Sequence, residues 1–370
     1  MTTIQDTVFK PFKYGPLELK NRVVMAPMTR TYSPGNIPSD LTVEYYRKRA
    51  AGGVGLIISE GTCIGHPAAN GYPNVPYFDT AEQLAGWKKV VDAVHAEGSK
   101  FFPQLWHVGS VRRQGMEPNP EVPGHAPSGM SQMPGKVTCH VMSEEDIWDT
   151  INAFAKAAKH AEDIGCDGVE FHGAHSYLVD QFFCPELNIR DDKWGGSVEN
   201  RSRFAIEIVK AARKLVSPDF PLAIRWSQWK VHDFNYKLAK DPKELEEFLM
   251  PLVDAGIDMF HSSTRRWWEP EFEGSDLTLA GWVKKVTGKP SIAVGSVGLN
   301  GPFCEVGEKE FMAAGTDNID NLVDCLEADE FDLVAVGRAL IANPDWANQV
   351  RDNEQDKLVA YKKEMLLKLV

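Results

Sequence analysis

The chain has 370 residues, of which 43% are hydrophobic and 25% charged, a composition typical of a folded globular protein and not of a disordered one. Its 40 Lys and Arg against 52 Asp and Glu give a net charge of −12, which argues against a nucleic-acid-binding or anionic-membrane surface. The amino-terminal residues lack a signal-peptide pattern and no apolar run is long enough to span a bilayer, so we expect a cytoplasmic protein without a membrane or nucleic-acid partner.

Eight short apolar segments rich in β-branched residues are spread along the chain. We predict them to be strands: Arg22–Pro27, Gly55–Glu60, Lys100–Trp106, Gly168–His172, Pro221–Trp226, Met259–Ser263, Ser291–Gly295 and Phe331–Gly337. Apolar residues at consecutive positions indicate strands that are buried on both faces, as in a parallel sheet.

Longer segments with helical spacing of apolar residues separate these strands. The predicted helices are Glu82–Glu97, Ser143–Ile164, Asn200–Leu215, Pro242–Ala255, Ser275–Val286 and Asn318–Leu326. Regular alternation of strand and helix predicts an α/β fold, and eight units favour a single (β/α)8 TIM barrel made by residues 1–370. An open doubly wound sheet would be expected to carry a G-x-G-x-x-G turn, which the sequence lacks.

Two connections are longer than a minimal barrel needs. They are His107–Met142, after the third strand, and Thr264–Gly274, after the sixth. Active sites of such barrels lie on the loops that follow the strands, so both are candidate lids or substrate walls. Simple packing over the barrel mouth is the alternative interpretation.

The segment after the fourth strand, His172-Gly-Ala-His175-Ser-Tyr177, carries the strongest chemical signal. Two imidazoles could donate N–H groups to one oxygen that becomes negative during a reaction, and Tyr177 could act as a general acid. H-x-x-H can also bind zinc, but no cysteine or carboxylate stands at a convincing ligand spacing, so we expect no metal. Either histidine alone could also be a hydrogen-bonded loop residue.

Other polar or small residues follow further strands and should gather at the same end of the barrel. Gly295-Ser296 and Gly337-Arg338 end the seventh and eighth strands, where barrels often bind a phosphate, although packing of small residues at the rim would give the same pattern. Thr29, Gln104 and Arg225 also stand at or near strand ends.

These residues belong to longer motifs that resemble the Old Yellow Enzyme family of FMN-dependent ene-reductases. The most specific is GVEFHGAHSYLVDQFFCPELNIRDDKWGGSVENRSRF at Gly168–Phe204. NRVVMAPMTR, ISEGT, PQLWHVG, AIR and VAVGRALIANPDW agree in order and spacing, so the resemblance covers almost the whole chain.

The resemblance implies a role for each site residue. FMN would have its phosphate near Gly295, Ser296, Gly337 and Arg338, its ring against Pro27, Thr29, Gly61 and Gln104, and Arg225 beside N1 and O2. His172 and His175 would bind the carbonyl oxygen of the substrate, and Tyr177 would protonate its α-carbon. NADH or NADPH would reduce the flavin first, in a ping-pong reduction of α,β-unsaturated carbonyl or nitro compounds. The substrate partner would be a small molecule, and a homo-oligomer is compatible with the sequence.

Several alternatives stay open at this point. Related flavin barrels demethylate or dehydrogenate amines or reduce nitroesters, although the multidomain amine dehydrogenases carry an iron–sulfur cysteine cluster that this chain lacks. An aldolase would be expected to have a Schiff-base lysine at a strand end, and a hydrolase a carboxylate–histidine metal cluster. The sequence shows neither at the predicted strand ends, which argues against a non-redox barrel. Phe183-Cys184-Pro185-Glu186 and Arg265-Arg266-Trp267-Trp268 match no characterised substrate pattern.

The six cysteines are scattered, without C-x-x-C spacing. We expect unpaired, mostly buried thiols in a reducing compartment at Cys63, Cys139, Cys166, Cys184, Cys304 and Cys325.

Overall fold

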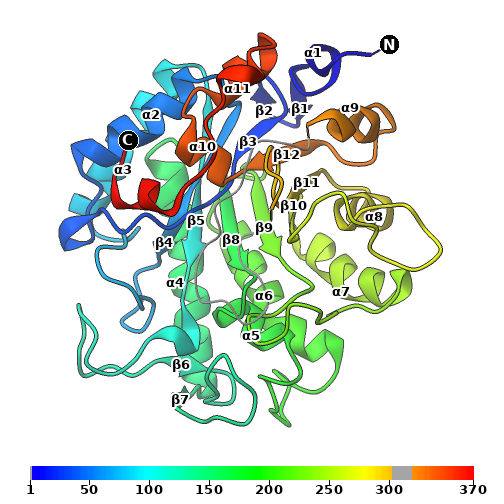
Figure 1. The fold of residues 1–370 in the computed structure, drawn as a ribbon. Helices are drawn as coiled ribbons and strands as arrows, with labels where there is room; N and C mark the ends of the chain where they lie inside the picture. The colour runs from blue at the N-terminus through cyan, green and yellow to red at the C-terminus, as the bar shows by residue number, and fades with distance from the viewer. Residues whose placement is uncertain (1, 302–318) are drawn as a thin grey trace.

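Eight parallel strands close into a barrel in the computed structural model, which describes residues 2–301 and 319–370 (Figure 1). Around the barrel the strands are β3 (Val23–Met25), β4 (Leu56–Cys63), β5 (Lys100–Trp106), β8 (Val169–Gly173), β9 (Leu222–Trp226), β10 (Met259–Ser263), β11 (Ser291–Val294) and β12 (Leu333–Val336). The predicted (β/α)8 TIM barrel is therefore confirmed, and each predicted strand contributes to it. Strands β5 and β10 have the predicted bounds.

An amino-terminal hairpin, β1 (Phe12–Tyr14) paired with β2 (Leu17–Leu19), was not predicted. Phe12, Leu17 and Leu19 pack in the same buried cluster as the inward-facing side chains of the barrel, so the hairpin plugs the end where the strands begin (Figure 1). Burial of each of these side chains stabilises the fold by roughly 1.5–3 kcal/mol. Strands of three residues are too short to show a period in the sequence.

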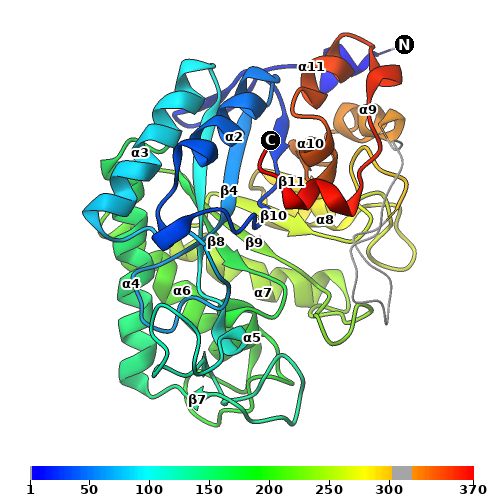
Figure 2. The same cartoon turned by 60° about the vertical axis from the view of Figure 1, so that its left-hand side comes forward.

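Helices cover the outside of the barrel (Figure 2). The longer ones are α2 (Asp40–Ala51), α3 (Ala81–Ala96), α4 (Glu144–Asp163), α6 (Val198–Arg213), α7 (Pro242–Ala255), α8 (Leu279–Thr287) and α9 (Asp320–Glu327). Short helices are α1 (Ile4–Thr7), α5 (Leu178–Phe183), α10 (Arg338–Ala342) and α11 (Trp346–Arg351). The structure contains all six predicted helices and adds α2 and the short ones.

Helix α4 shows how the sequence sets these elements. Ser143 and Asp146 form a capping box at its start, with the Ser143 side chain accepting from the Asp146 backbone N–H. Ile147, Ile151 and Phe154 lie on the buried face because they recur at helical spacing. Helix α8, by contrast, begins later than predicted, because the Thr278 side chain caps it by accepting from the Gly281 backbone N–H.

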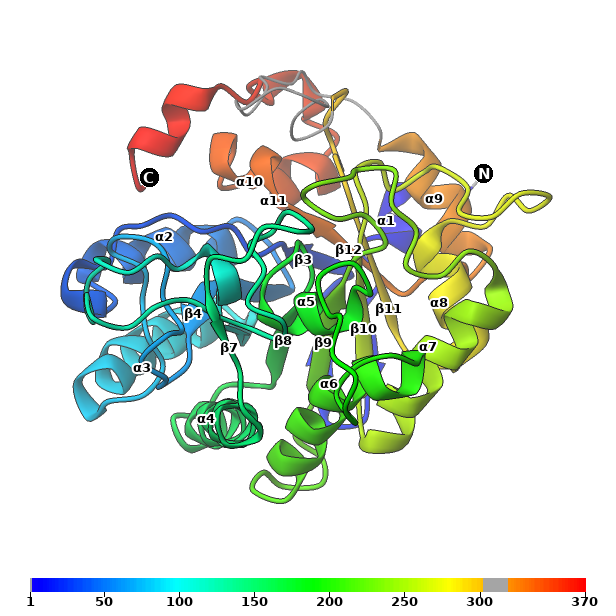
Figure 3. The same ribbon diagram turned by 90° about the horizontal axis from the view of Figure 1, so that it is seen from below.

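Both long connections are present where the sequence predicts them, at the carboxyl ends of the strands (Figure 3). Residues 107–142 contain the paired strands β6 (His125–Ala126) and β7 (His140–Val141), and residues 264–278 lead from β10 to α8. The carboxyl-terminal tail returns to α2, where Arg49 donates to the backbone carbonyls of Leu340 and Val370.

No helix in the described parts of the chain is long and apolar enough to cross a bilayer. Cys304 lies outside the described residues. The remaining thiols, of Cys63, Cys139, Cys166, Cys184 and Cys325, are unpaired, and three of them are buried.

Candidate active site

Four aromatic rings meet at the carboxyl ends of β5 and β8. His172, in β8, stacks on Trp106, the last residue of β5, with ring centroids 5.9 Å apart. Tyr177 meets both of them edge-on, at 4.8 Å from Trp106 and 5.0 Å from His172. His175 completes the group, 5.3 Å from His172. The structure thus brings the three predicted catalytic side chains together.

The turn that aims these side chains has an unusual backbone. His175 and Ser176 both have positive φ, at 62° and 57°, a conformation that costs about 1–3 kcal/mol for a residue other than glycine. Asp180 holds the turn by accepting from the Ser176 backbone N–H at 2.7 Å, and it pairs with Lys230 at 2.6 Å. Both partners of this ion pair are fully buried. The strained turn is therefore fixed by a buried charge pair beneath it.

The two histidines are held in the neutral form. Burial, with Arg225 nearby, keeps the pKa of both His172 and His175 well below the ordinary value. Nδ1 of His172 accepts from the Ala174 backbone N–H at 3.3 Å, which places the ring proton on Nε2 as a donor. Nε2 of His175 lies 2.8 Å from the Ser263 hydroxyl. Neutral imidazoles can donate N–H to an oxygen without carrying a full charge into the site.

The Tyr177 hydroxyl lies 3.0 Å from the hydroxyl of Tyr72. Burial raises the pKa of Tyr177 well above the ordinary value, so the phenol keeps its proton at neutral pH. Tyr72 comes from the loop after β4 and stacks on Trp106, with ring centroids 5.5 Å apart. The two hydroxyls form a short chain that can supply and replace one proton.

A polar network lies inside the barrel beneath these rings. Glu170 accepts from Gln104 Nε2 at 2.8 Å and lies 2.6 Å from His261 Nδ1. Arg225 donates to the Ser263 hydroxyl at 3.2 Å, whereas its Nε is buried and has no hydrogen-bond partner among the described residues. Burial lowers the pKa of Arg225 to about 10, so its guanidinium stays positive at neutral pH. An unpartnered buried N–H on a cation is a ready donor to an electronegative ligand atom.

The residues predicted to bind a phosphate also come together. Arg338 donates to the Ser296 hydroxyl at 3.4 Å and to the carbonyl of Gly301 at 2.8 Å, which joins the ends of β11 and β12. Gly295 has φ 143°, and a Cβ there would lie 2.7 Å from the carbonyl oxygen of Thr264. At Gly337 the nearest atom to such a Cβ is 3.6 Å away, so this backbone is open to a ligand.

The remaining predicted residues lie on β4 and just after β3. Thr29 is exposed and Pro27 half-buried. Gly61 pairs with Gln104 after an irregularity in β4, and a Cβ there would lie 2.4 Å from the ring of Trp106. Glycine is therefore needed at this position for the indole to lie against the strand.

The chain matches known proteins over nearly its full length. The sequence profile of the NADH:flavin oxidoreductase / NADH oxidase family covers residues 7–357. 12-Oxophytodienoate reductase 1 of Oryza sativa subsp. japonica is 36% identical over 341 residues, 90% of this chain and 83% of the relative. The chain belongs to this family, that of the Old Yellow Enzymes. It is a flavin oxidoreductase of the ene-reductase type.

Solved structures of Old Yellow Enzyme relatives agree with this assignment. Morphinone reductase in complex with tetrahydroNAD has a TM-score of 0.80 at 30% identity, covering 97% of this chain and 94% of its own. Old Yellow Enzyme from Pichia sp. AKU4542 also has a TM-score of 0.80, at 28% identity, covering 98% and 91%.

Some residues of this Old Yellow Enzyme site were not found from the sequence. Tyr72 lies in an irregular loop that gives no periodic signal, and Trp229, which stacks on His175 at 4.7 Å, stands three residues beyond β9. Ser263 could have been found, because it ends a predicted strand. Of the two tryptophans that flank the site in sequence, Trp106 lines it, whereas Trp226 packs against Phe248 of α7 at 5.4 Å.

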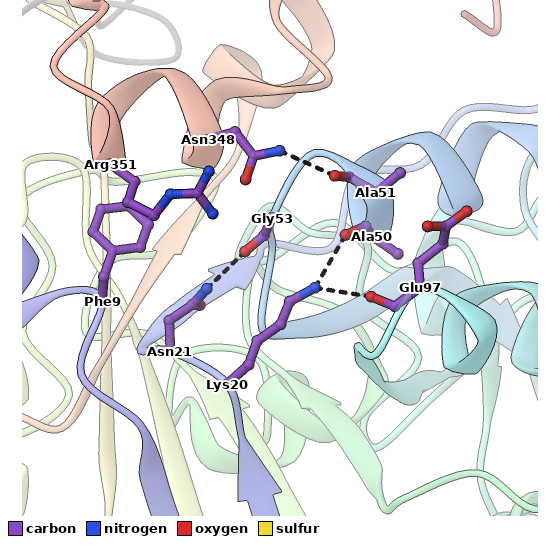
Figure 4. A pocket seen from close by; sticks show the side chains of 9 residues that line it. All are labelled: Phe9, Lys20, Asn21, Ala50, Ala51, Gly53, Glu97, Asn348 and Arg351. Carbon is purple, nitrogen blue, oxygen red and sulfur yellow. Dashed lines mark hydrogen bonds between the residues drawn. The ribbon is translucent and has the colours of Figure 1, made fainter.

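A separate hollow of about 380 Å³ lies at the opposite end of the barrel, where the strands begin (Figure 4). Lys20 donates to the carbonyls of Ala50 and Glu97, at 3.2 and 3.0 Å, and Asn21 donates to that of Gly53 at 2.7 Å. Backbone carbonyls already satisfy these side chains, so we assign the hollow a structural role and not a catalytic one.

Proposed function

We propose that this protein binds FMN and uses NADH or NADPH to reduce the C=C bond of α,β-unsaturated carbonyl or nitro compounds, with nicotinamide and alkene occupying one site in turn. The observation that carries the proposal is the meeting of two neutral histidines and a protonated tyrosine above a buried, positively charged arginine. Relatives support it: one is named a 12-oxophytodienoate reductase, and another was solved with a nicotinamide analogue.

The residues present fit FMN. Arg225 offers an unpartnered, buried N–H to the electronegative N1–O2 edge of the isoalloxazine, and its charge would stabilise negative charge there. Arg338, Ser296 and the open backbone at Gly337 would hold the phosphate. Pro27, Thr29, Gly61 and Gln104 would line the ring, and Gly295 would complete the phosphate end. When bound, FMN takes a hydride from the nicotinamide and supplies one to the alkene.

The histidine pair would bind the carbonyl or nitro oxygen of the substrate. His172 donates from Nε2, because its Nδ1 is occupied by the Ala174 N–H. His175 has two ways to donate: from Nε2 in place of its contact with Ser263, or from Nδ1 if the Ser263 hydroxyl donates to Nε2. Two such donors stabilise the negative charge that collects on the oxygen as the β-carbon accepts the hydride.

Tyr177 would protonate the α-carbon. Its raised pKa is compatible with this role, because the carbon that receives the proton is far more basic than a phenolate. Tyr72 can pass a proton to Tyr177 through the 3.0 Å contact between their hydroxyls. The unpaired thiols of the described residues support work in a reducing compartment such as the cytoplasm.

The test is an anaerobic titration of the purified protein reconstituted with FMN. We expect tightly bound flavin whose visible absorbance is bleached by NADH or NADPH and restored by 2-cyclohexen-1-one. Bleaching by a methylated amine, but not by either nicotinamide, would instead favour the demethylase alternative. A protein that retains no flavin after reconstitution would contradict the proposal.

A further inference from the structure

Three metal-ligating side chains meet outside the site described above. Cys184 caps the carboxyl end of helix α5, Glu186 lies two residues further on, and His232 lies on the loop after β9. The ligand atoms of these three residues all lie within 4.8 Å of one another. His232 Nε2 is 2.9 Å from Glu186 Oε2. The catalytic proposal gives no task to any of the three.

We propose that Cys184, Glu186 and His232 form a binding site for a divalent transition-metal ion, with Zn²⁺ as the preferred ion. One thiolate, one imidazole and one carboxylate are ligands that zinc accepts together, and three protein ligands leave the fourth tetrahedral position to water. A set that includes a soft sulfur disfavours Mg²⁺ and Ca²⁺, which prefer oxygen ligands.

The two segments that supply the ligands are fixed relative to each other before any ion binds. The buried pair of Lys230 and Asp180 joins the loop after β9 to helix α5, at 2.6 Å. The Val231 backbone N–H donates to the Ser176 hydroxyl at 3.1 Å, next to His232 in the chain. The Cys184 backbone N–H donates to the carbonyl of Asp180 at 3.1 Å. A preorganised ligand set lowers the entropic cost of binding.

The burial of the three side chains suits an ion that enters from solvent. The Glu186 side chain is 49% exposed and marks the entrance, whereas that of His232 is only 6% exposed. His232 Nδ1 is buried and has no hydrogen-bond partner among the described residues. Either ring nitrogen of His232 can therefore bind the metal ion. The exposed Glu186 carboxylate would bind the same ion from the solvent side.

Binding must displace the thiol proton: Cys–SH and Zn²⁺ give Cys–S–Zn and H⁺, with no change of oxidation state. Burial raises the pKa of the Cys184 thiol, although the charge of Lys230 acts in the opposite direction. Zinc affinity should therefore fall as the pH is lowered, because the metal ion competes with the proton of the thiol.

A bound ion would brace the wall of the candidate active site. The loop that carries His232 also carries Trp229, which stacks on His175, and helix α5 begins directly after Tyr177. An ion that links the end of α5 to this loop would therefore stabilise the turn at His175 and Ser176, which contacts both of them. We expect Zn²⁺ to raise the thermal unfolding temperature of the protein, because the ion binds the folded chain preferentially.

The experiment uses the flavin-reconstituted protein after removal of metal by a chelator. Equilibrium dialysis measures zinc stoichiometry and affinity, and zinc X-ray absorption detects sulfur in the coordination sphere. We expect one Zn²⁺ per chain with one sulfur at about 2.3 Å. Cys184→Ser should abolish the sulfur signal. Loss of a residue that only contacts a metal ligand typically weakens metal binding by about 10–100-fold. Cys184→Ser and His232→Gln each remove a ligand and should weaken zinc binding by more than that.

Cys166→Ser is the matched control, because Cys166 is a buried thiol away from the cluster. It should leave zinc stoichiometry and the zinc-induced rise in unfolding temperature unchanged, whereas Cys184→Ser should remove that rise. Wild-type protein without a stoichiometric zinc ion, or Cys184→Ser with unchanged affinity, would overturn the proposal. None of these measurements requires turnover, so their outcome is separate from that of the proposed reaction.

Discussion

The hydroxyls of Tyr177 and Tyr72 lie 3.0 Å apart, and only Tyr177 packs directly against His172. We therefore expect Tyr177→Phe to slow reoxidation of the flavin by 2-cyclohexen-1-one by about 100-fold or more, the usual contribution of a general acid. Reduction of the flavin by NADH or NADPH needs no such proton and should change little. Stopped-flow measurement of each half-reaction checks this.

Tyr72→Phe is the matched control for that experiment. It removes the neighbouring hydroxyl but leaves the proton on Tyr177, so enone reoxidation should slow less than in Tyr177→Phe. If Tyr177→Phe leaves both half-reactions unchanged, Tyr177 is not the main proton donor.

His172 offers a second test at the level of one side chain. A phenol such as 4-hydroxybenzaldehyde presents an oxygen anion of the kind that the histidine pair would stabilise. His172→Ala should weaken phenol binding by roughly tenfold or more, which corresponds to loss of about one charge-assisted hydrogen bond. Titration of the flavin absorbance with the phenol measures the affinity. Wild-type affinity together with an unchanged charge-transfer band would count against the role of His172.

Twelve site residues could be named from the sequence, because most of them belong to motifs shared with the family and all stand at or near predicted strands. The structure brings His172, His175 and Tyr177 together and joins Ser296 to Arg338, while the roles of all twelve stay predictions. Tyr72 and Trp229 could not be named, because each stands in an irregular loop whose path depends on tertiary contacts. For Glu170 and His261 the sequence predicts only that they lie in strands, because no sequence pattern shows that their side chains pair across the barrel.

At the scale of elements, the contact between α5 and the loop after β9 depends on the Lys230–Asp180 pair. Lys230→Met should lower the free energy of unfolding by about 3–5 kcal/mol, because it leaves the fully buried Asp180 carboxylate without its positive partner. Lys88→Met is the control: Lys88 and Asp92 form an exposed pair on α3 whose loss should cost less than about 1 kcal/mol. Denaturant unfolding of both variants measures the difference, and equal costs would show that the buried pair does not hold the turn.

Strands and helices were predictable where they are long and periodic. Helix α4 has a capping box and a regular buried face, and β5 and β10 are uninterrupted apolar runs. The hairpin of β1 and β2 was missed because its strands have three residues each. Helix α2 was missed because few apolar residues mark its buried face, where Thr42, Arg49 and two tyrosines lie.

For the whole molecule, buried neutral histidines link stability to pH. Burial lowers the pKa of several histidines below the unfolded value near 6.5, to about 4 for His66; among them are His66, His107, His125, His172, His175 and His261. Below pH 6.5 the unfolded chain binds protons that the folded chain does not. Their stabilising contribution is therefore complete above that pH and is lost as the pH falls towards the folded pKa values.

The free energy of unfolding should accordingly fall between pH 6.5 and 5, by up to about 1.4 kcal/mol per pH unit for each such histidine. Denaturant unfolding at several pH values measures this slope. His66→Asn should make it shallower, since it removes one titrating group. A His66→Asn variant with the same slope as the wild-type protein would show that His66 is not buried in the neutral form.

The fold as a whole could be predicted, because eight strands that alternate with helices favour a closed barrel, which the structure has. That residues 1–370 form one domain stays a prediction. The substrate is the least predictable property, because it depends on the loops at residues 107–142 and 264–278, whose positions are set by packing and not by local pattern.

The central claim is that hydride reaches the β-carbon of an activated alkene while Tyr177 protonates the α-carbon. Isotope labelling tests it most directly. The flavin-loaded enzyme is given 2-cyclohexen-1-one and NADH or NADPH deuterated at the transferred C4 position, and the product is analysed by NMR. We expect deuterium at C3 of the cyclohexanone and, in a separate reaction in deuterated water with unlabelled nicotinamide, solvent deuterium at C2. Deuterium at the carbonyl carbon, or no labelled product while bound flavin is still bleached by the nicotinamide, would contradict the account.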